Sequence, residues 1–349
     1  MFEAKTVSFN KTGYDPFIDF IKAYAILCVL IGHTLPFTDY WGYGLWAGMQ
    51  VPLFVLVQVF HGFKKDTLNV KIQKIFIRVI LPYLLIQSIA LIYTISFYDD
   101  SSKISYFKGG GVGPGSYYPW IFLQIALLLP FVKKWIDKNQ EDRTKVLITF
   151  LIICESFEIL FSVIDLPDSI YRLLAVRYLF LLYLAWIWVR DGIVINKVTT
   201  LFSFLSFLSI IYFEYLSVDD EVLFYNTAWK FHRWPCYYFV AIWGGYLLRM
   251  LYEFLRSKPS IMNSIKLLAK CSYEIFLIQM LVIYVYPGGY IKDYIVMCGV
   301  DNFIIVEIIQ LIVKILVVFF LSIYLGYYFN LCYNKFVNKD QIFYRRKNG

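Results

Sequence analysis

Long apolar stretches separated by short polar segments run along the whole chain. A helix needs about 20 predominantly apolar residues to cross a bilayer, and such stretches recur from Ile18 to Leu331. The pattern predicts an all-α, polytopic membrane protein with about ten transmembrane helices in one bundle. The predicted helices cover Ile18–Pro36, Tyr43–Phe63, Ile75–Phe97, Tyr117–Trp135, Val146–Ile164, Tyr171–Val189, Val198–Leu216, Trp234–Tyr252, Leu267–Tyr286 and Phe303–Leu331.

Lysine and arginine residues gather after every second predicted helix. Lys64 and Lys65 follow the second helix, Lys133 and Lys134 the fourth, and Arg256 the eighth, whereas the alternate loops hold few basic residues. Cytoplasmic loops carry the excess of Lys and Arg in membrane proteins. We therefore predict that the N- and C-termini are both cytoplasmic, with short tails at about residues 1–16 and 335–349.

The composition agrees with a membrane protein. Hydrophobic residues make up 60% of the 349 residues and charged residues 17%, whereas soluble domains contain about 25% charged residues. The net charge of +8 comes from the loop lysines and arginines, so we expect membrane lipids and no nucleic acid as partners. The apolar content is even along the chain, which predicts one membrane domain over residues 1–349.

The first apolar stretch carries three ionisable residues, Asp19, Lys22 and His33. Ionisable groups at membrane depth are costly and usually functional. Ten residues separate Lys22 from His33, and at about 100° per residue this spacing is within roughly 20° of three full helical turns. Both side chains are therefore predicted to face one way, about 16 Å apart along the helix, with Lys22 near the cytoplasmic surface and His33 near the outer one.

Each candidate also has a simpler explanation. Lys22 could extend its ammonium to the lipid headgroups, and His33 could be an interfacial histidine at the outer rim. Arg78, at the cytoplasmic end of the third predicted helix, could be an ordinary positive anchor. Only the combination of the three residues favours catalysis.

The first predicted helix resembles a known family. Asp19-x-x-Lys22, followed after ten residues by Gly32-His33-Thr34, is similar to the first helix of the acyltransferase-3 family of bacterial integral-membrane O-acyltransferases. In that family an acid, a basic residue and a histidine occupy these places. The similarity covers nearly the whole chain, and it predicts a single acyltransferase-3-like membrane domain.

Weaker motifs follow downstream, with two departures from the family pattern. Arg78-x-x-x-Pro82 resembles the Arg-x-x-x-Pro motif at the start of the family's third span, and the segment from Ser272 to Gln279 resembles its ninth-span signature. Ile75 stands where a second arginine is common, and Gln279 stands where many members have histidine. Because glutamine replaces histidine there, the resemblance implies no catalytic role for Gln279.

The resemblance implies transfer of an acyl group, usually acetyl from cytoplasmic acetyl-CoA, to a hydroxyl of a cell-surface or exported polysaccharide or its lipid-linked precursor. It also implies the bacterial cytoplasmic (inner) membrane, an acyl-CoA as co-substrate and no bound cofactor. Lys22 and Arg78 would bind the polyanionic donor. His33 would be the catalytic base or a covalent relay, because imidazole titrates near neutral pH, and Asp19 would orient or neutralise Lys22.

Four further polar residues are candidate substrate contacts. Glu158 and Arg177 lie in the fifth and sixth predicted helices, where pairing inside the bundle is the alternative role. His232, just before Trp234, could contact a sugar acceptor or anchor the outer interface. Tyr273 belongs to the ninth-span motif.

A glycine-rich segment, Gly109–Gly115, occupies the longest predicted external loop. No Lys-Ser/Thr pair follows it, so a nucleotide-binding loop is not expected. A flexible cap over an outward cavity or a re-entrant connector is the better interpretation. Metal catalysis and serine hydrolysis are not expected either, since the chain has no His-Glu-x-x-His motif, no Cys/His cluster and no Gly-x-Ser-x-Gly.

Two other functions stay open. The same buried charges could line the path of a transporter or flippase for a glycan or an acyl intermediate, although no internal repeat supports a transporter. Alternatively, the chain could be a degenerate, non-catalytic family member that assembles with glycan-synthesis proteins. Neither the acyl group, nor the acceptor, nor the oligomeric state follows from the sequence.

Overall fold

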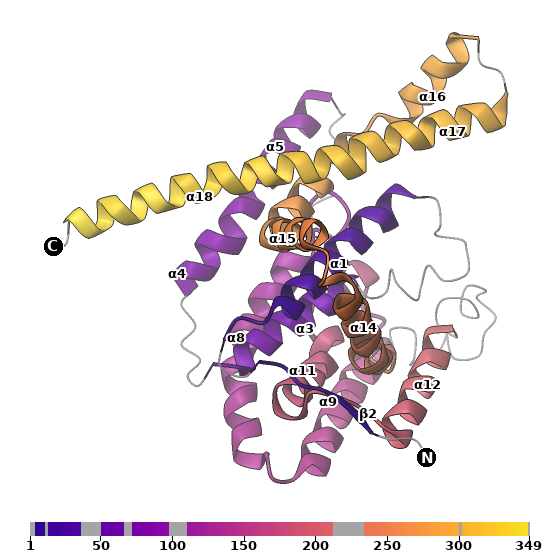
Figure 1. Cartoon of the computed structure of the whole chain (residues 1–349). Coiled ribbons are helices and arrows are strands. Elements are labelled where there is room, and N and C mark those ends of the chain that lie inside the picture. Colours follow the sequence, from indigo (N-terminus) through magenta and orange to yellow (C-terminus); the bar gives the residue numbers. More distant parts are fainter. Residues whose placement is uncertain are drawn as a thin grey trace. The chain divides into compact units, whose positions relative to one another are not determined.

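The chain forms a mostly helical structure that divides into two compact units (Figure 1). The computed structural model describes residues 4–10, 13–35, 50–65, 72–97, 110–211, 234–299 and 302–347. Unit 1 consists of Met1–Ala25, Trp41–Val70 and Trp120–Lys266, and unit 2 of Ile26–Tyr40, Lys71–Pro119 and Leu267–Gly349. The first helix and the helix that begins at Pro259 each contribute residues to both units.

Unit 1 combines helices with one small sheet. Its elements are β1 (Lys5–Val7), the first part of α1 (Pro16–Thr34), α3 (Gln50–Phe63), α8 (Tyr118–Asn139), α9 (Arg143–Val163), α10 (Asp168–Tyr171), the 3₁₀ turn η2 (Ala175–Tyr178), α11 (Leu179–Asp191), β2 (Ile193–Ile195), α12 (Lys197–Ile211), α13 (Cys236–Phe239), the π-helical turn η4 (Val240–Gly244) and α14 (Gly245–Leu255). Helix α11 packs against α3 and α9.

The mostly helical fold also contains a small two-stranded sheet, which the sequence did not predict. β1 and β2 pair antiparallel, with Lys5 opposite Ile195 and Val7 opposite Ile193. Gly192 precedes β2 with φ +76°, and a Cβ there would collide with the carbonyl of Val7, so the connection requires glycine. Three-residue strands carry too little alternation to be recognised in a chain this apolar. The predicted N-terminal tail is therefore partly a strand of unit 1.

Aromatic side chains form the centre of unit 1 beside this sheet. The fully buried Trp188 of α11 donates its indole N–H to the carbonyl of Ala241 at 3.0 Å. Phe9 stacks on Trp188 with ring centroids 5.1 Å apart and also contacts Phe60 of α3 at 4.9 Å. The segment between β1 and α1 is thus anchored by aromatic packing.

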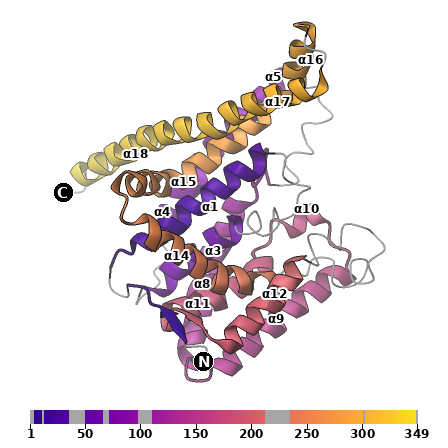
Figure 2. The ribbon, with the colours of Figure 1, turned by 45° about the vertical axis from the view of Figure 1, so that its right-hand side comes forward.

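Unit 2 contains long helical runs. Its elements are the second part of α1, α4 (Ile72–Ile75), the π-helical turn η1 (Phe76–Ile80), α5 (Leu81–Phe97), most of α15 (Pro259–Val285), α16 (Gly288–Met297), α17 (Phe303–Lys314), the π-helical stretch η5 (Ile315–Leu321) and α18 (Ser322–Lys347). In Figure 2, α18 runs close beside α15. A Cβ at Gly326 of α18 would lie 2.6 Å from the Cα of Ile275, so the two backbones approach closely there.

Five helical runs of the described chain are long and apolar enough to cross a membrane. They are Pro16–Thr34, Ile72–Phe97, Tyr118–Asn139, Pro259–Val285 and Phe303–Val337, and α3 and α12 are shorter apolar helices. Only 11% of the most apolar window of the last run is buried. Its exposed side chains include Ile308, Ile312 and Phe320. Such a surface suits hydrocarbon, because soluble proteins rarely expose a continuous apolar face of this size.

Helical structure lies within each of the predicted helix ranges. The sixth range, Tyr171–Val189, is nevertheless not one helix. There Gln124 of α8 donates to the carbonyl of Leu173 at 2.6 Å and accepts from the amide of Ala175 at 2.9 Å. The helix is interrupted at these residues, and the Gln124 side chain satisfies the backbone groups that the interruption leaves without helical partners. The count of about ten crossings, the single domain and the cytoplasmic side of both termini stay predictions.

Candidate functional site

Helix α1 begins at a conventional cap, which places Asp19 in its first turn. The Asp15 side chain accepts a hydrogen bond from the amide of Phe17 at 3.0 Å, and Pro16 occupies the first helical position. An aspartate cap followed by proline is a strong helix start. The second carboxylate oxygen of Asp15 accepts from the amide of Asn10 at 3.1 Å, so the cap also fixes the chain before the helix.

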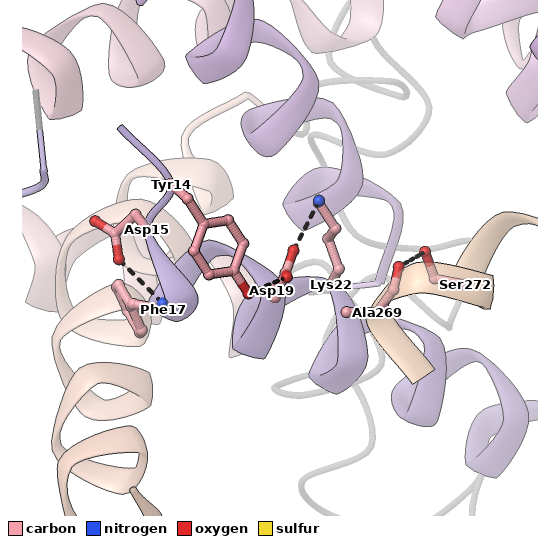
Figure 3. A network of polar contacts seen from close by, with 7 residues as sticks. All are labelled: Tyr14, Asp15, Phe17, Asp19, Lys22, Ala269 and Ser272. Atoms are coloured by element: carbon pink, nitrogen blue, oxygen red, sulfur yellow. Dashed lines mark hydrogen bonds and ion pairs between the residues drawn. The ribbon is translucent and has the colours of Figure 1, made fainter. Parts of the chain in front are cut away.

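Asp19 is the centre of a small polar network (Figure 3). Its carboxylate accepts from the Tyr14 hydroxyl at 2.6 Å and from the Lys22 ammonium at 3.0 Å. The two ends of the Asp19–Lys22 ion pair are 20% and 27% exposed. The spacing of three residues brings both side chains to one face of the helix. The predicted pairing of Asp19 with Lys22 is therefore present in the structure.

Tyr14 is a partner of Asp19 that the sequence analysis did not identify. Burial and then the hydrogen bond to the Asp19 carboxylate raise the pKa of Tyr14 to about 12. The preceding residue, Gly13, is held by the turn that follows α3, because the Lys64 ammonium donates to the carbonyl of Gly13 at 2.6 Å. The phenol therefore stays protonated at neutral pH and donates to Asp19 from a fixed segment.

An open hollow lies near this turn in unit 1. Residues 6–8, at the end of β1 and just after it, and Tyr246, Arg249 and Glu253 of α14 line a volume of about 480 Å³. The Arg249 guanidinium binds Glu253 at 2.8 Å and stacks over the ring of Phe17 at 5.1 Å. Since its arginine is already neutralised, the hollow is a weak candidate for an anion site.

His33 lies in the last turn of α1 and is half-buried. α1 is one uninterrupted helix, so Asp19, Lys22 and His33 occupy a single rod as predicted. Lys314 of α17, in the same unit as His33, is close enough to interact with the imidazole electrostatically. Lys22 belongs to unit 1 and His33 to unit 2, and the expectation that their side chains face one way stays a prediction.

Arg78 lies in the middle of the π-helical turn η1. Its side chain is exposed, and in the part of the chain that the structure describes it forms no ion pair with a carboxylate. An exposed guanidinium without a carboxylate partner keeps its donors available for phosphate. Its predicted role in donor binding is compatible with this geometry.

Tyr273 of α15 contacts the backbone of that same turn. Its hydroxyl donates to the carbonyl of Val79 at 2.7 Å. A second phenol, Tyr333 of α18, donates to the carbonyl of Ile77. The proton of Tyr273 is thus used within the protein, and its predicted contact with substrate stays a prediction. The sequence analysis did not identify Tyr333. A signal was present, because Pro82 has no N–H and leaves a carbonyl near Arg78 without a helical donor.

Glu158 and Arg177 meet through an aromatic side chain in unit 1. Buried Glu158 of α9 accepts from the Tyr171 hydroxyl at 2.6 Å. The Arg177 guanidinium lies over the Tyr171 ring at 5.7 Å and over the Tyr178 ring at 5.3 Å. This arrangement stabilises the connection between α9 and α11, the structural role that the sequence left open. His232 lies outside the described residues.

The described part of the glycine-rich segment is docked onto helices of unit 2. Gln87 of α5 donates to the carbonyl of Val112 at 3.2 Å and accepts from its amide at 2.8 Å. Gly113 has φ +84°, and a Cβ there would lie 2.6 Å from the carbonyl oxygen of Met280 in α15. Close backbone approach explains the glycine. These contacts favour the re-entrant connector over the flexible cap; Gly109 itself lies outside the described residues.

Comparison with known proteins places the chain in a family. A family model described as an acyltransferase domain matches residues 15–338. No curated protein and no solved structure matches the chain. The matched region begins at the capping residue of α1 and includes Lys22, His33 and Arg78. The chain therefore belongs to the acyltransferase-3 family, and its apolar helices make it an integral membrane protein.

Proposed function

We propose that this protein is an O-acyltransferase of the bacterial cytoplasmic membrane. It transfers acetyl from cytoplasmic acetyl-CoA to a hydroxyl of an exported or cell-surface polysaccharide, or of its lipid-linked precursor. The observation that carries the proposal is that one membrane-length helix bears Asp19 and Lys22 in its first two turns and His33 in its last. A cation suited to a polyanionic donor and a base suited to a hydroxyl thus lie toward opposite ends of one span.

In the proposed reaction, His33 removes the proton from the acceptor hydroxyl as the oxygen attacks the thioester carbonyl. The carbon–sulfur bond breaks, the thiolate of CoA leaves, and the proton on the imidazole is then released to it or to water. General base catalysis of this kind contributes about 10²- to 10⁴-fold to a rate. Lys22 and Arg78 bind the phosphates of the donor, and Asp19 sets the position and net charge of Lys22.

The test is acetyl transfer from radiolabelled acetyl-CoA in membranes that contain the protein and its acceptor. His33→Ala is expected to lower transfer at least about 100-fold because the general base is lost. His61→Ala is the comparison variant: His61 lies in the last turn of α3 and interacts electrostatically with Lys22 and Asp19, so at saturating acetyl-CoA it should keep the transfer that His33→Ala loses. Equal transfer by His33→Ala and the intact protein would refute the catalytic role of His33. Flux of a glycan without release of CoA would indicate a transporter instead.

A further inference from the structure

The backbone that carries Arg78 is distorted because of a proline four residues later. In an α-helix the ring of Pro82 would clash with the carbonyl of Arg78, and Pro82 has no N–H to donate. The chain responds with the π-helical turn η1, in which the amide of Leu81 bonds to the carbonyl of Phe76. The wider turn avoids the clash, but in its i→i+5 pattern the carbonyl of Ile77 would need the missing amide of Pro82.

Two phenols from distant helices bond to the carbonyls on either side of Arg78. Tyr333 donates to the carbonyl of Ile77. This carbonyl has no donor within the turn, because Pro82 lacks an N–H. Tyr273 donates to Val79 at 2.7 Å. These tyrosines lie 256 and 194 residues away from their partners in sequence, and both belong to unit 2. Tyr333 is 8% exposed, so its hydroxyl replaces a backbone donor in a site that water reaches poorly.

The direction of the Arg78 side chain depends on the π-helical turn that carries it. A π-helical turn holds one residue more than an α-helical turn, and one residue corresponds to about 100° of rotation. If the π-helical turn became α-helical or unfolded locally, the Arg78 side chain would point in a different direction. The guanidinium itself has no carboxylate to hold it in the described chain, so the backbone is the element that fixes it.

We propose that Tyr333 and Tyr273 are positioning residues for Arg78, holding the π-helical turn so that the guanidinium meets the phosphates of the acyl donor. The inference rests on the proposed function, in which Arg78 binds acetyl-CoA. Neither tyrosine touches the reacting atoms in this proposal. Their effect is on donor binding alone, through the carbonyls of Ile77 and Val79.

Donor kinetics of phenylalanine variants test this role. Tyr333→Phe and Tyr273→Phe each remove one hydroxyl and keep the ring, so packing is preserved. We expect each to raise the donor KM about three- to tenfold, the effect of losing one buried hydrogen bond, with kcat and the acceptor KM unchanged. Tyr284→Phe is the matched control, because this α15 phenol bonds to Thr94 of α5 at 2.6 Å, away from Arg78.

A double-mutant cycle separates failure of this inference from failure of the proposed function. In the Arg78→Ala background, the phenylalanine variants are expected to raise the donor KM no further. An equal rise in both backgrounds would overturn the positioning role. If Arg78→Ala itself leaves the donor KM unchanged, the donor role of Arg78 in the proposed function fails. If Arg78→Ala raises the KM but neither phenylalanine variant does, the positioning inference fails by itself.

Hydrogen exchange provides a readout that does not depend on activity. In detergent-purified protein, the amides of residues 76–81 are expected to exchange at least about fivefold faster in Tyr333→Phe than in the intact protein, because the turn opens more often. The same amides should be unaffected in Tyr284→Phe. Unchanged protection of the turn in both Tyr333→Phe and Tyr273→Phe would overturn the inference.

Discussion

Lys22 and Arg78 look alike in the sequence, as two cations at the expected cytoplasmic ends of helices, but the structure holds them in different ways. Lys22 lies on a regular helix and has its own counter-charge, Asp19, at 3.0 Å. Arg78 lies on a π-helical turn, has no carboxylate partner in the described chain, and has both neighbouring carbonyls bound by phenols. One cation is positioned by charge and the other by its backbone.

In the function proposed above, this difference gives the two residues different parts in donor binding. Lys22 is already paired with an aspartate, so it contributes only part of its charge to donor binding. Another cationic side chain at this position can supply the same charge. An arginine on a fixed turn, with no carboxylate partner among the described residues, offers a planar fork for bidentate contact with phosphate, which lysine cannot reproduce. Substitutions at the two sites are therefore expected to differ in tolerance, and four predictions test this.

The largest effect is expected from reversing the charge of Lys22. Lys22→Glu places two carboxylates beside the donor, and we expect the donor KM to rise about 100-fold, the equivalent of about 3 kcal/mol. Lys22→Arg should retain activity because it preserves the charge. Steady-state kinetics with varied acetyl-CoA measure both. An unchanged KM in the Glu variant would remove Lys22 from the donor site.

Arg78→Ala is expected to raise the donor KM about 10- to 30-fold, since a charge-assisted contact is lost. Arg78→Lys should still raise it about fivefold, because the bidentate geometry is lost while the charge stays. This intolerance contrasts with the expected tolerance of Lys22→Arg. Full activity of Arg78→Lys would show that the two cations act alike and that the fixed turn has no role in binding.

Removing the counter-charge is expected to have a smaller effect of opposite sign. Asp19→Asn frees the positive charge of Lys22, so the donor KM should fall about two- to fivefold, as for a partly exposed ion pair worth up to about 1 kcal/mol. The decrease should weaken at high salt, where charges are screened. A rise in KM would show instead that Asp19 acts by orienting the ammonium.

Tyr14→Phe is expected to have the smallest effect, a change of donor KM below about twofold, because Tyr14 is 60% exposed and neutral. Since the pKa of Tyr14 is raised to about 12, the folded protein retains this proton above the ordinary tyrosine pKa of about 10. Stability from the bond to Asp19 is therefore lost only as pH rises toward 12. Activity profiles of the variant and the intact protein should coincide up to about pH 10.

The local chemistry of α1 could be predicted because it depends on neighbours in sequence. The cap at Asp15-Pro16, the length of the apolar stretch and the three-residue spacing of Asp19 and Lys22 each act within one or two turns. The turn at Arg78 could have been predicted as well. Proline four residues after it excludes a regular helix there, and this signal lay in the Arg-x-x-x-Pro motif.

Other predictions failed or stayed incomplete where distant segments decide the structure. The sheet was missed because β1 and β2 form strands only by pairing with each other. The pairing joins residues far apart in sequence, Lys5 with Ile195 and Val7 with Ile193. Of the two interpretations that the sequence left open for the glycine-rich segment, its contacts with Gln87 and Met280 favour the re-entrant connector. Spacing along the chain gives none of these contacts.

The sequence by itself determined that this protein is a helical membrane protein with an acid, a lysine and a histidine on its first helix, because apolar length and helical period are local properties. Its motifs resemble those of the acyltransferase-3 family, and the family match over residues 15–338 agrees. The tertiary structure decided how the cations are held. Tyr333 and Tyr273 reach the carbonyls beside Arg78 only after the chain has packed, since a hydrogen bond depends on position in space and is indifferent to separation in sequence.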